Sequence, residues 1–155
     1  VGAIVNQQLS VESAAAIRER LFDRVEVSPA GVQDAEESTL RDVGLSGQKI
    51  EYVRNVAAAF DERDLTREGL AAESDEAVID ALTEIRGVGV WTAKMYLIYV
   101  LGRPDVFPVE DLGVRKAMAE LYGYDDGDRD GMTDHAERWR PYRSYASRYL
   151  WRVVD

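Results

Sequence analysis

The sequence predicts an all-α fold, and three observations favour this class. Apolar residues recur at intervals of three and four, the period of a helix with one buried face. Serine, aspartate and glycine stand where helices begin and end, and no segment shows the alternation of apolar and polar residues typical of a strand. The 155 residues suffice for one domain with a hydrophobic core, so we expect residues 1–155 to form a single domain.

The first helices are each indicated by an apolar series at helical spacing. These series are Ala14, Ile17, Leu21 and Val25, then Ile50, Val53, Ala57 and Phe60, then Val78, Leu82 and Ile85. The expected N-caps are Ser46 and Ser74, and the expected terminators are Gly44, Gly87, Gly102 and Gly123. The spacing of these stops predicts eight or nine helices.

The second half of the chain contains the most apolar segment. Residues 93–101 are almost wholly apolar, which predicts a central helix buried on most sides. Pro104 and Pro108 favour an extended segment before a further helix begins at Asp111. The polar segments 28–38 and 125–131 are expected to be solvated loops.

Composition excludes several classes of protein. The chain has no cysteine, which excludes disulfides, thiolate metal sites and cysteine nucleophiles. No apolar run is long enough to span a membrane, and no signal-peptide pattern opens the chain. The chain begins at Val1 without an initiator methionine, so we expect it to be a domain excised from a longer protein.

The net charge of −10 argues, by itself, against a nucleic-acid-binding protein. The charges are unevenly distributed, however. Residues 138–152 contain five arginines and no acid, whereas residues 1–137 contain fourteen basic and twenty-eight acidic residues. An acidic coat with one basic segment suits a DNA-binding protein in a salt-loving organism, because high salt screens the repulsion.

A Gly-x-Gly turn between two helical segments is the first chemical motif. Ile85 precedes Gly87-Val88-Gly89, and Thr92-Ala93 follow at the start of the next helix. Glycines let backbone N–H groups approach a phosphate at a helix N-terminus, where the helix dipole favours anions. The alternative interpretation is a helix C-cap followed by an ordinary tight turn.

The second motif places an acidic residue at the start of a helix. It reads Val106-Phe107-Pro108-Val109-Glu110-Asp111-Leu112. A phosphate-binding turn with a carboxylate beside it indicates chemistry on a nucleic acid backbone or base. Asp111 is our candidate catalytic residue, and Glu110 is the neighbouring competitor. The simpler alternative for Asp111 is a helix N-cap, and the two roles are compatible.

Together these motifs resemble those of the helix-hairpin-helix (HhH-GPD) DNA glycosylase superfamily. Within this superfamily they are most similar to the 3-methyladenine DNA glycosylase II branch. Four segments match in the family's order, namely 4–10, 85–93, 107–113 and 139–151. The resemblance implies two helical lobes with the active cleft between them. It also implies a monomeric enzyme that flips alkylated purines out of damaged double-stranded DNA and hydrolyses their N-glycosidic bonds. No cofactor is expected, because the absence of cysteine excludes the iron–sulfur cluster of some relatives.

The resemblance assigns Asp111 as the catalytic carboxylate and indicates the walls of a base pocket. Trp91 stands where strand-cleaving relatives carry a nucleophilic lysine, which implies a monofunctional glycosylase. An indole also attracts electron-poor or cationic alkylated bases. Its alternative is a core tryptophan. Trp151 is implied as a second wall, with Met95 and Tyr96 one turn after Trp91.

The DNA-binding residues are implied by two segments. Gln8 is the expected wedge that fills the gap left by the flipped base, with Gln7 and Leu9 as runners-up; the alternative is a polar helix terminus capped by Ser10. The hairpin is expected to hold a DNA phosphate through its backbone. The hairpin residues with this role are Gly87, Val88, Gly89 and Thr92. The carbonyls of Arg86 and Val88 are candidate ligands for a monovalent cation, although no metal is required.

Other interpretations remain open at this point. A glycosylase for uracil or an oxidised base is the nearest, and a non-catalytic helix-hairpin-helix module for damaged DNA is the next. Residues 126–137 match the spacing of a calcium-binding EF-hand loop, a match that we expect to be accidental. We expect the sole histidine, His135, to lie at the surface, and Tyr145 and Tyr149 to pack. We also expect a cytoplasmic, DNA-associated protein of a prokaryote, and the acidic composition favours a halophile.

Overall fold

The structure is a computed structural model that describes residues 1–7 and 9–154. It is all-helical over these residues, as predicted. The helices are α1 (Gly2–Asn6), α2 (Val11–Arg24), α3 (Pro29–Asp34), α4 (Glu37–Asp42), α5 (Gly47–Glu62), α6 (Asp75–Thr83), α7 (Val90–Tyr99), α8 (Leu112–Tyr122), α9 (Arg129–Ala136), the 3₁₀-helix η1 (Glu137–Trp139) and α10 (Arg143–Val154).

The predicted N-caps agree with the structure, and Gly44 and Gly123 stand at the ends of α4 and α8, whereas Gly87 and Gly102 lie beyond the C-caps of α6 and α7. The side chains of Ser10, Ser46 and Ser74 cap α2, α5 and α6 by accepting a backbone N–H three residues later. The four predicted terminators all adopt positive φ, from +65° to +112°, a region that favours glycine. Capping chemistry therefore sets most of the boundaries that the sequence predicted.

The predicted loop at residues 28–38 is wrong, because this segment contains α3 and the start of α4. Ser28 caps α3 by accepting the Gly31 N–H, and Pro29 suits the first helical position. The two helices are six residues long and bury one apolar side chain each, Val32 and Leu40. Short helices of this kind give no periodic apolar series, so the described chain holds ten α-helices instead of eight or nine.

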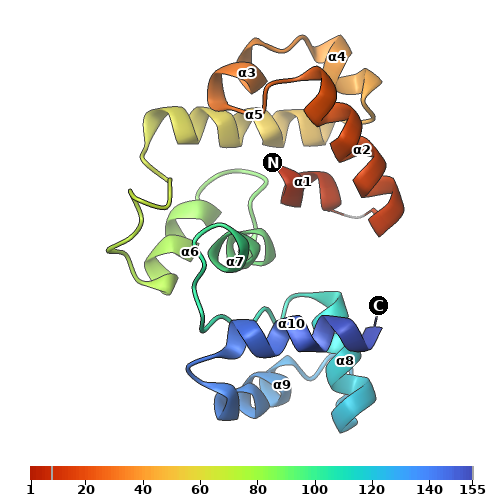
Figure 1. Ribbon diagram of the computed structural model, residues 1–155, viewed down its shortest axis with the longest axis vertical. Helices are drawn as coiled ribbons and strands as arrows, with labels where there is room; N and C mark the ends of the chain where they lie inside the picture. Colours follow the sequence, from red (N-terminus) through yellow and green to blue (C-terminus); the bar gives the residue numbers. More distant parts are fainter. Residues whose placement is uncertain (8, 155) are drawn as a thin grey trace.

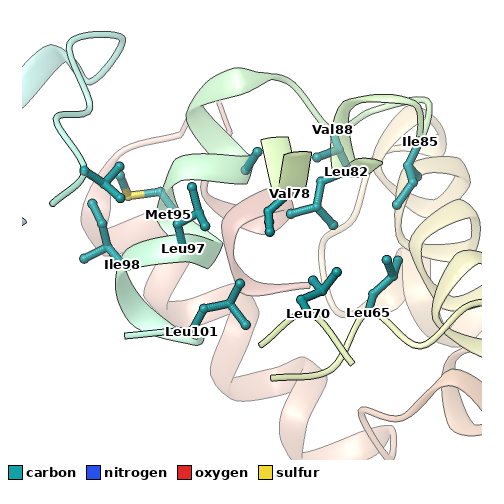
Figure 2. Packing of buried hydrophobic residues seen from close by; sticks show 12 residues of the cluster. Leu65, Leu70, Val78, Leu82, Ile85, Val88, Met95, Leu97, Ile98 and Leu101 are labelled. Atoms are coloured by element: carbon teal, nitrogen blue, oxygen red, sulfur yellow. The ribbon is translucent and has the colours of Figure 1, made fainter. Parts of the chain in front are cut away.

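The helices are arranged in three tiers (Figure 1). Helices α1–α5 surround a first apolar core, α6 and α7 build a second, and α8–α10 enclose a third. Figure 2 shows how the second core forms: Val78 and Leu82 of α6 point toward Leu97 of α7 and toward Leu70. This packing fixes α7 at the centre of the molecule, as the apolar segment 93–101 predicted.

The first and second cores lie in one lobe, and the third core lies in a second lobe. The first lobe comprises α1–α7 and the second comprises α8–α10, and an extended segment that includes Pro104 and Pro108 joins them. A cavity of about 680 Å³ lies between α1, α5 and α7, and residues of the second lobe complete its wall. No helix among residues 1–7 and 9–154 is long and apolar enough to cross a membrane.

Candidate active site

Asp111 lies at the N-terminus of α8 and borders the cavity. Its Oδ2 accepts the backbone N–H of Val114 at 3.0 Å, so the residue is the helix N-cap. The same carboxylate also faces the cavity, so Asp111 is both the N-cap of α8 and a residue of the cavity wall. The cap bond holds the carboxylate in place at the start of α8.

Two tryptophans donate hydrogen bonds to this carboxylate. Nε1 of Trp91, at the start of α7, donates to Oδ1 at 2.8 Å. Nε1 of Trp151, from α10, donates to Oδ2 at 2.7 Å. Because an indole N–H is a neutral donor that cannot take up the charge, the carboxylate is oriented without being neutralised. The three residues come from different helices, and all three line the cavity.

The cavity is lined mainly by apolar side chains, among them Val56, Phe60 and Met95. Met95, predicted as a wall, is 9% exposed and belongs to the central core as well. The ring of Tyr96 also lines the cavity, but its hydroxyl donates to the Leu65 carbonyl and is therefore engaged elsewhere. The interior consequently presents a wide apolar surface with one carboxylate at its edge.

Tyr99 is a wall residue that sequence reasoning missed. Its ring stacks on the Trp151 indole, with ring centroids 5.9 Å apart and planes 21° apart. Burial raises its pKa, so its hydroxyl stays protonated near neutral pH. Trp91, Met95 and Tyr99 follow each other at intervals of four residues, which places them on one face of α7. That spacing was a signal that could have found Tyr99.

Gly113 allows the carboxylate and the indole to meet. A Cβ at this position would lie 3.1 Å from both Asp111 Oδ2 and Trp151 Cδ1, closer than ordinary van der Waals contact. The side chain of Trp151 therefore passes over α8 at the one residue that carries no side chain. This glycine is a second site residue that the sequence did not reveal.

Glu110, the competitor of Asp111, is used structurally. Its Oε1 accepts from Nζ of Lys94 at 2.9 Å, and Lys94 also donates to the Phe107 carbonyl at 3.0 Å. Arg115 donates to the Val109 and Glu110 carbonyls. The segment that leads to Asp111 is thus held from α7 and from α8, and Lys94 is committed to that contact.

The hairpin between α6 and α7 contains two glycines with different reasons to be glycine. Gly87 has φ +101°, and a Cβ there would lie 2.2 Å from the Tyr52 ring. Gly89, by contrast, has φ −93°, and a Cβ there would meet no described atom within 4 Å. Gly89 precedes α7, whose first turn receives no side-chain cap from the residues that the structure describes. Its N–H groups are available to an anion.

The predicted wedge segment lies against this hairpin. Nε2 of Gln7 donates to the Gly87 carbonyl at 3.1 Å and to Thr92 Oγ1 at 3.3 Å. Leu9 is exposed, whereas Gln8, the preferred wedge, lies outside the described residues. The segment is therefore tied to the first turn of α7, and Val88 packs into the central core below it.

The expected cation ligands are two hairpin carbonyls. The Arg86 carbonyl accepts from Nδ2 of Asn55 at 3.2 Å, which uses one of its two lone pairs. The second lone pair, together with the Val88 carbonyl, is compatible with a monovalent cation. The cation itself stays a prediction.

Two expectations outside the site are wrong. His135 is 8% exposed, because its ring packs against Tyr122 and Trp139, and the Tyr124 hydroxyl lies 3.0 Å from its Nδ1. Tyr145 and Tyr149 are exposed by 51% and 69%. They lie on the face of α10 opposite the buried Ser147 and Leu150, whereas we expected them to pack.

The segment that resembles a calcium loop has a different conformation. Asp128 caps α9 by accepting the Gly131 N–H, so the glycine expected at the sharp turn lies inside a helix. Asp126 pairs with Arg115 instead. Among residues 1–7 and 9–154, no group of three potential ligands is arranged for a metal ion. Helix capping accounts for Asp128 and an ion pair with Arg115 accounts for Asp126, so neither aspartate requires calcium to explain its position.

Comparison with known proteins places these features in a family. The model of the HhH-GPD superfamily of base excision DNA repair proteins matches residues 1–141. The chain belongs to this superfamily. The match includes the hairpin and Asp111 and ends before α10, so Trp151 lies beyond it.

Relatives of the HhH-GPD chain include DNA-3-methyladenine glycosylase 1 of Schizosaccharomyces pombe, which is 31% identical over 99% of this chain and 70% of its own length. The solved structure of that yeast's 3-methyladenine DNA glycosylase in complex with abasic DNA matches with a TM-score of 0.89 and 32% identity, over 97% of this chain and 76% of that one. A DNA-3-methyladenine glycosidase from Bacillus halodurans matches with a TM-score of 0.82 and 36% identity, over 97% and 71%.

The chain is shorter than these relatives. It spans 56% of the length of YfjP of Bacillus subtilis, to which it is 33% identical over 98% of its own residues. The fold and the site described above therefore correspond to one part of such proteins.

Proposed function

We propose that this chain is the catalytic domain of a monofunctional DNA glycosylase that hydrolyses the N-glycosidic bond of alkylated purines of the 3-methyladenine type. The observation that carries the proposal is the Asp111 carboxylate, held by two indole N–H groups and a helix N-terminus at the wall of a large apolar cavity. The relatives named for this activity support the same substrate class. We further propose damaged duplex DNA as the partner and a monomer as the active form.

Binding begins at the hairpin. The uncapped N–H groups at the start of α7 hold one phosphate, and the glycine at position 89 lets the DNA backbone approach closely. The damaged nucleotide then rotates out of the duplex into the cavity, while a residue of the segment 7–9 fills the gap. A cationic or electron-poor base is attracted to the faces of Trp91 and Tyr99.

The chemical step breaks the bond between the base nitrogen and C1′ of the sugar. The electron pair of that bond leaves with the base, and positive charge develops on the sugar. The Asp111 carboxylate stabilises this charge and orients a water whose oxygen bonds to C1′. The proton of the water is lost to the carboxylate or to solvent, and the product is an abasic site in an intact strand.

The lining of the cavity favours an alkylated base over uracil or an oxidised guanine. Selecting those bases requires hydrogen bonds to their edges, because an unpaired polar group in a built site strongly disfavours the wrong ligand. Three polar groups at the wall are already engaged: Asp111 by three donors, the Tyr96 hydroxyl by Leu65, and Thr92 by Gln7. Asn6, Arg18 and Tyr99 also line the cavity, and the buried Oδ1 of Asn6 has no hydrogen-bond partner among the described residues. The apolar lining and the ring faces of Trp91 and Tyr99 favour stacking and charge as the main selective interactions.

Base release from defined duplexes tests the proposal. Duplexes carrying methylated purines, uracil or 8-oxoguanine are incubated with the chain, and free bases and strand breaks are quantified separately. We expect release of the methylated purine with an intact strand, since Trp91 replaces the lysine nucleophile. Release of uracil or 8-oxoguanine alone would contradict the substrate class, and tight binding with no release would indicate a non-catalytic module.

A further inference from the structure

The exposed face of α10 carries a row of arginines and tyrosines. Tyr145, Arg148, Tyr149 and Arg152 follow at intervals of three and one, so they share one side of the helix. We call these four residues the arginine–tyrosine stripe. All four are exposed, Tyr149 by 69%, and Arg152 lies over the Tyr149 ring at 5.5 Å. Tyrosines of this size left in solvent on a basic helix face need an explanation beyond packing.

The two arginines of the stripe differ from the other arginines of the same segment. Arg140 and Arg143 form ion pairs with Asp105 and Glu137 and so serve the fold. Arg148 and Arg152 have no carboxylate within 4.0 Å among the residues that the structure describes. In a chain with a net charge of −10, this face keeps two cations directed to solvent.

The stripe is continuous with the active site. The Arg148 guanidinium lies 5.6 Å from the centre of the Tyr99 ring, which in turn stacks on Trp151 beside Asp111. Tyr99 ends α7 and Thr92 lies in its first turn, seven residues earlier. At 1.5 Å per residue the two ends are about 10 Å apart, roughly three base steps along a DNA duplex. One bound duplex can therefore contact the hairpin and the stripe together.

We propose that the arginine–tyrosine stripe is a second DNA-backbone site, which binds phosphates on the side of the flipped nucleotide opposite the hairpin. This inference rests on the proposed function. Arg148 and Arg152 supply the charge, and the hydroxyls of Tyr145 and Tyr149 supply neutral donors to phosphate oxygens. The stripe explains how an acidic chain holds DNA: repulsion from its other surfaces is offset by a short cationic row beside the cavity.

The salt dependence of DNA binding tests the stripe. Binding to a duplex with an abasic-site analogue is measured by fluorescence anisotropy from low to moderate salt. The variants are R148Q/R152Q, the charge-retaining R148K/R152K, and a control, R67Q/R129Q, that removes two exposed arginines elsewhere. Base release from methylated duplex is measured for the wild-type chain in parallel. Thermal unfolding confirms that each variant is folded.

Each phosphate contact contributes about 0.9 to the slope of log Kobs against log salt, so the glutamine pair should lower the slope by about 1.8. The lysine pair should largely restore it, and the control should leave it near the wild-type value. An equal loss in the control pair would overturn the inference, because it would show a general charge effect. An unchanged slope in R148Q/R152Q would also overturn it, and accompanying self-association would assign the face to a second copy of the chain. Failure of the wild type itself to release base would instead overturn the proposed function.

Discussion

The Asp111 carboxylate is held by neutral donors on both oxygens, and this arrangement separates positioning from charge. Each indole N–H contributes a hydrogen bond to an ionised group without supplying a counter-charge. The negative charge therefore remains available to a developing sugar cation. A lysine or arginine at either position would orient the carboxylate equally well but would cancel part of its field.

Gly113→Ala tests how closely this arrangement depends on shape. Alanine normally stabilises a helix interior by about 0.5–1 kcal/mol relative to glycine. Here the added Cβ forces apart Asp111 Oδ2 and Trp151 Cδ1, each 3.1 Å away. We expect base release in single-turnover assays to fall about tenfold, the equivalent of about 1.4 kcal/mol, while the melting temperature does not decrease.

The control for this variant is Gly127→Ala, where an added Cβ meets no described atom within 4 Å. It should leave base release unchanged. A Gly113→Ala chain that releases base at the wild-type rate would show that the carboxylate and the indole do not need their present spacing.

Individual site residues could be predicted from the sequence only where a local motif carries them. Asp111 and Trp91 stand in recognisable segments, and the structure places both at the wall of one cavity. The hydrogen bonds that Asp111 accepts from Trp91 and Trp151 were not predictable, because residues twenty and forty positions apart meet only through helix packing. Gly113 was missed for the same reason, whereas the interval of four residues after Met95 was a signal that could have indicated Tyr99.

The hairpin shows at the scale of an element why two glycines of one motif respond differently to substitution. Gly87 is required by the fold, since its positive φ and the adjacent Tyr52 ring exclude a side chain. Gly89 has a negative φ, and an added Cβ there would meet no described atom within 4 Å, so the fold does not require a glycine at this position. Under the proposed function, its lack of a side chain lets the DNA backbone approach the start of α7 closely.

Gly89→Ala should therefore affect binding without affecting folding. We expect the melting temperature to stay within about 2 °C of wild type, since surface changes of this kind are usually within about 0.5 kcal/mol. Affinity for abasic duplex should fall about tenfold or more, measured by anisotropy at constant salt. Gly87→Ala should instead lower the melting temperature clearly. Equal affinity of Gly89→Ala and wild type would remove the hairpin from the DNA interface.

Longer elements with a clear apolar signal were predictable, α5 from its apolar period and α7 from its almost wholly apolar sequence, whereas α3 and α4 were not. A six-residue helix that buries one side chain has no period to detect, and its existence depends on the core that receives Val32 or Leu40. The start of α9 inside a presumed loop has a similar cause. Asp128 caps a helix whose apolar contacts, through Met132 and Ala136, lie in the third core.

At the scale of the whole molecule, the second lobe contains a buried titratable group. His135 packs among aromatic rings, and burial lowers its pKa from the ordinary value near 6.5. The unfolded chain then binds a proton near pH 6.5 while the folded chain does not. The free energy of unfolding must therefore decrease as the pH falls below about 6.5.

Urea unfolding at pH 5.5, 6.5 and 7.5 checks this prediction. We expect wild type to be more stable at pH 7.5 than at pH 5.5, and we expect His135→Gln to reduce that difference. His135 is the only histidine, so no other imidazole contributes to the difference between the two chains. The same pH dependence in both chains would place the titrating group elsewhere.

The acidic surface and the basic stripe give the whole molecule an uneven field. If the acidic coat is an adaptation to high salt, base release should persist at molar salt, where repulsion between the coat and DNA is screened.

The site depends on both lobes, because α7 of the first lobe supplies Trp91, whereas the second lobe supplies Asp111 and Trp151.

The most direct test of the central claim compares wild type with Asp111→Asn in single-turnover release of methylated purine at saturating duplex. Asparagine keeps the size of the side chain and its capacity to cap α8, but it removes the negative charge and one acceptor. We predict a decrease of about a hundredfold or more in release, with affinity for abasic duplex changed by only a few-fold. Release at the wild-type rate by Asp111→Asn would contradict the assignment of Asp111 as the group that stabilises the sugar cation.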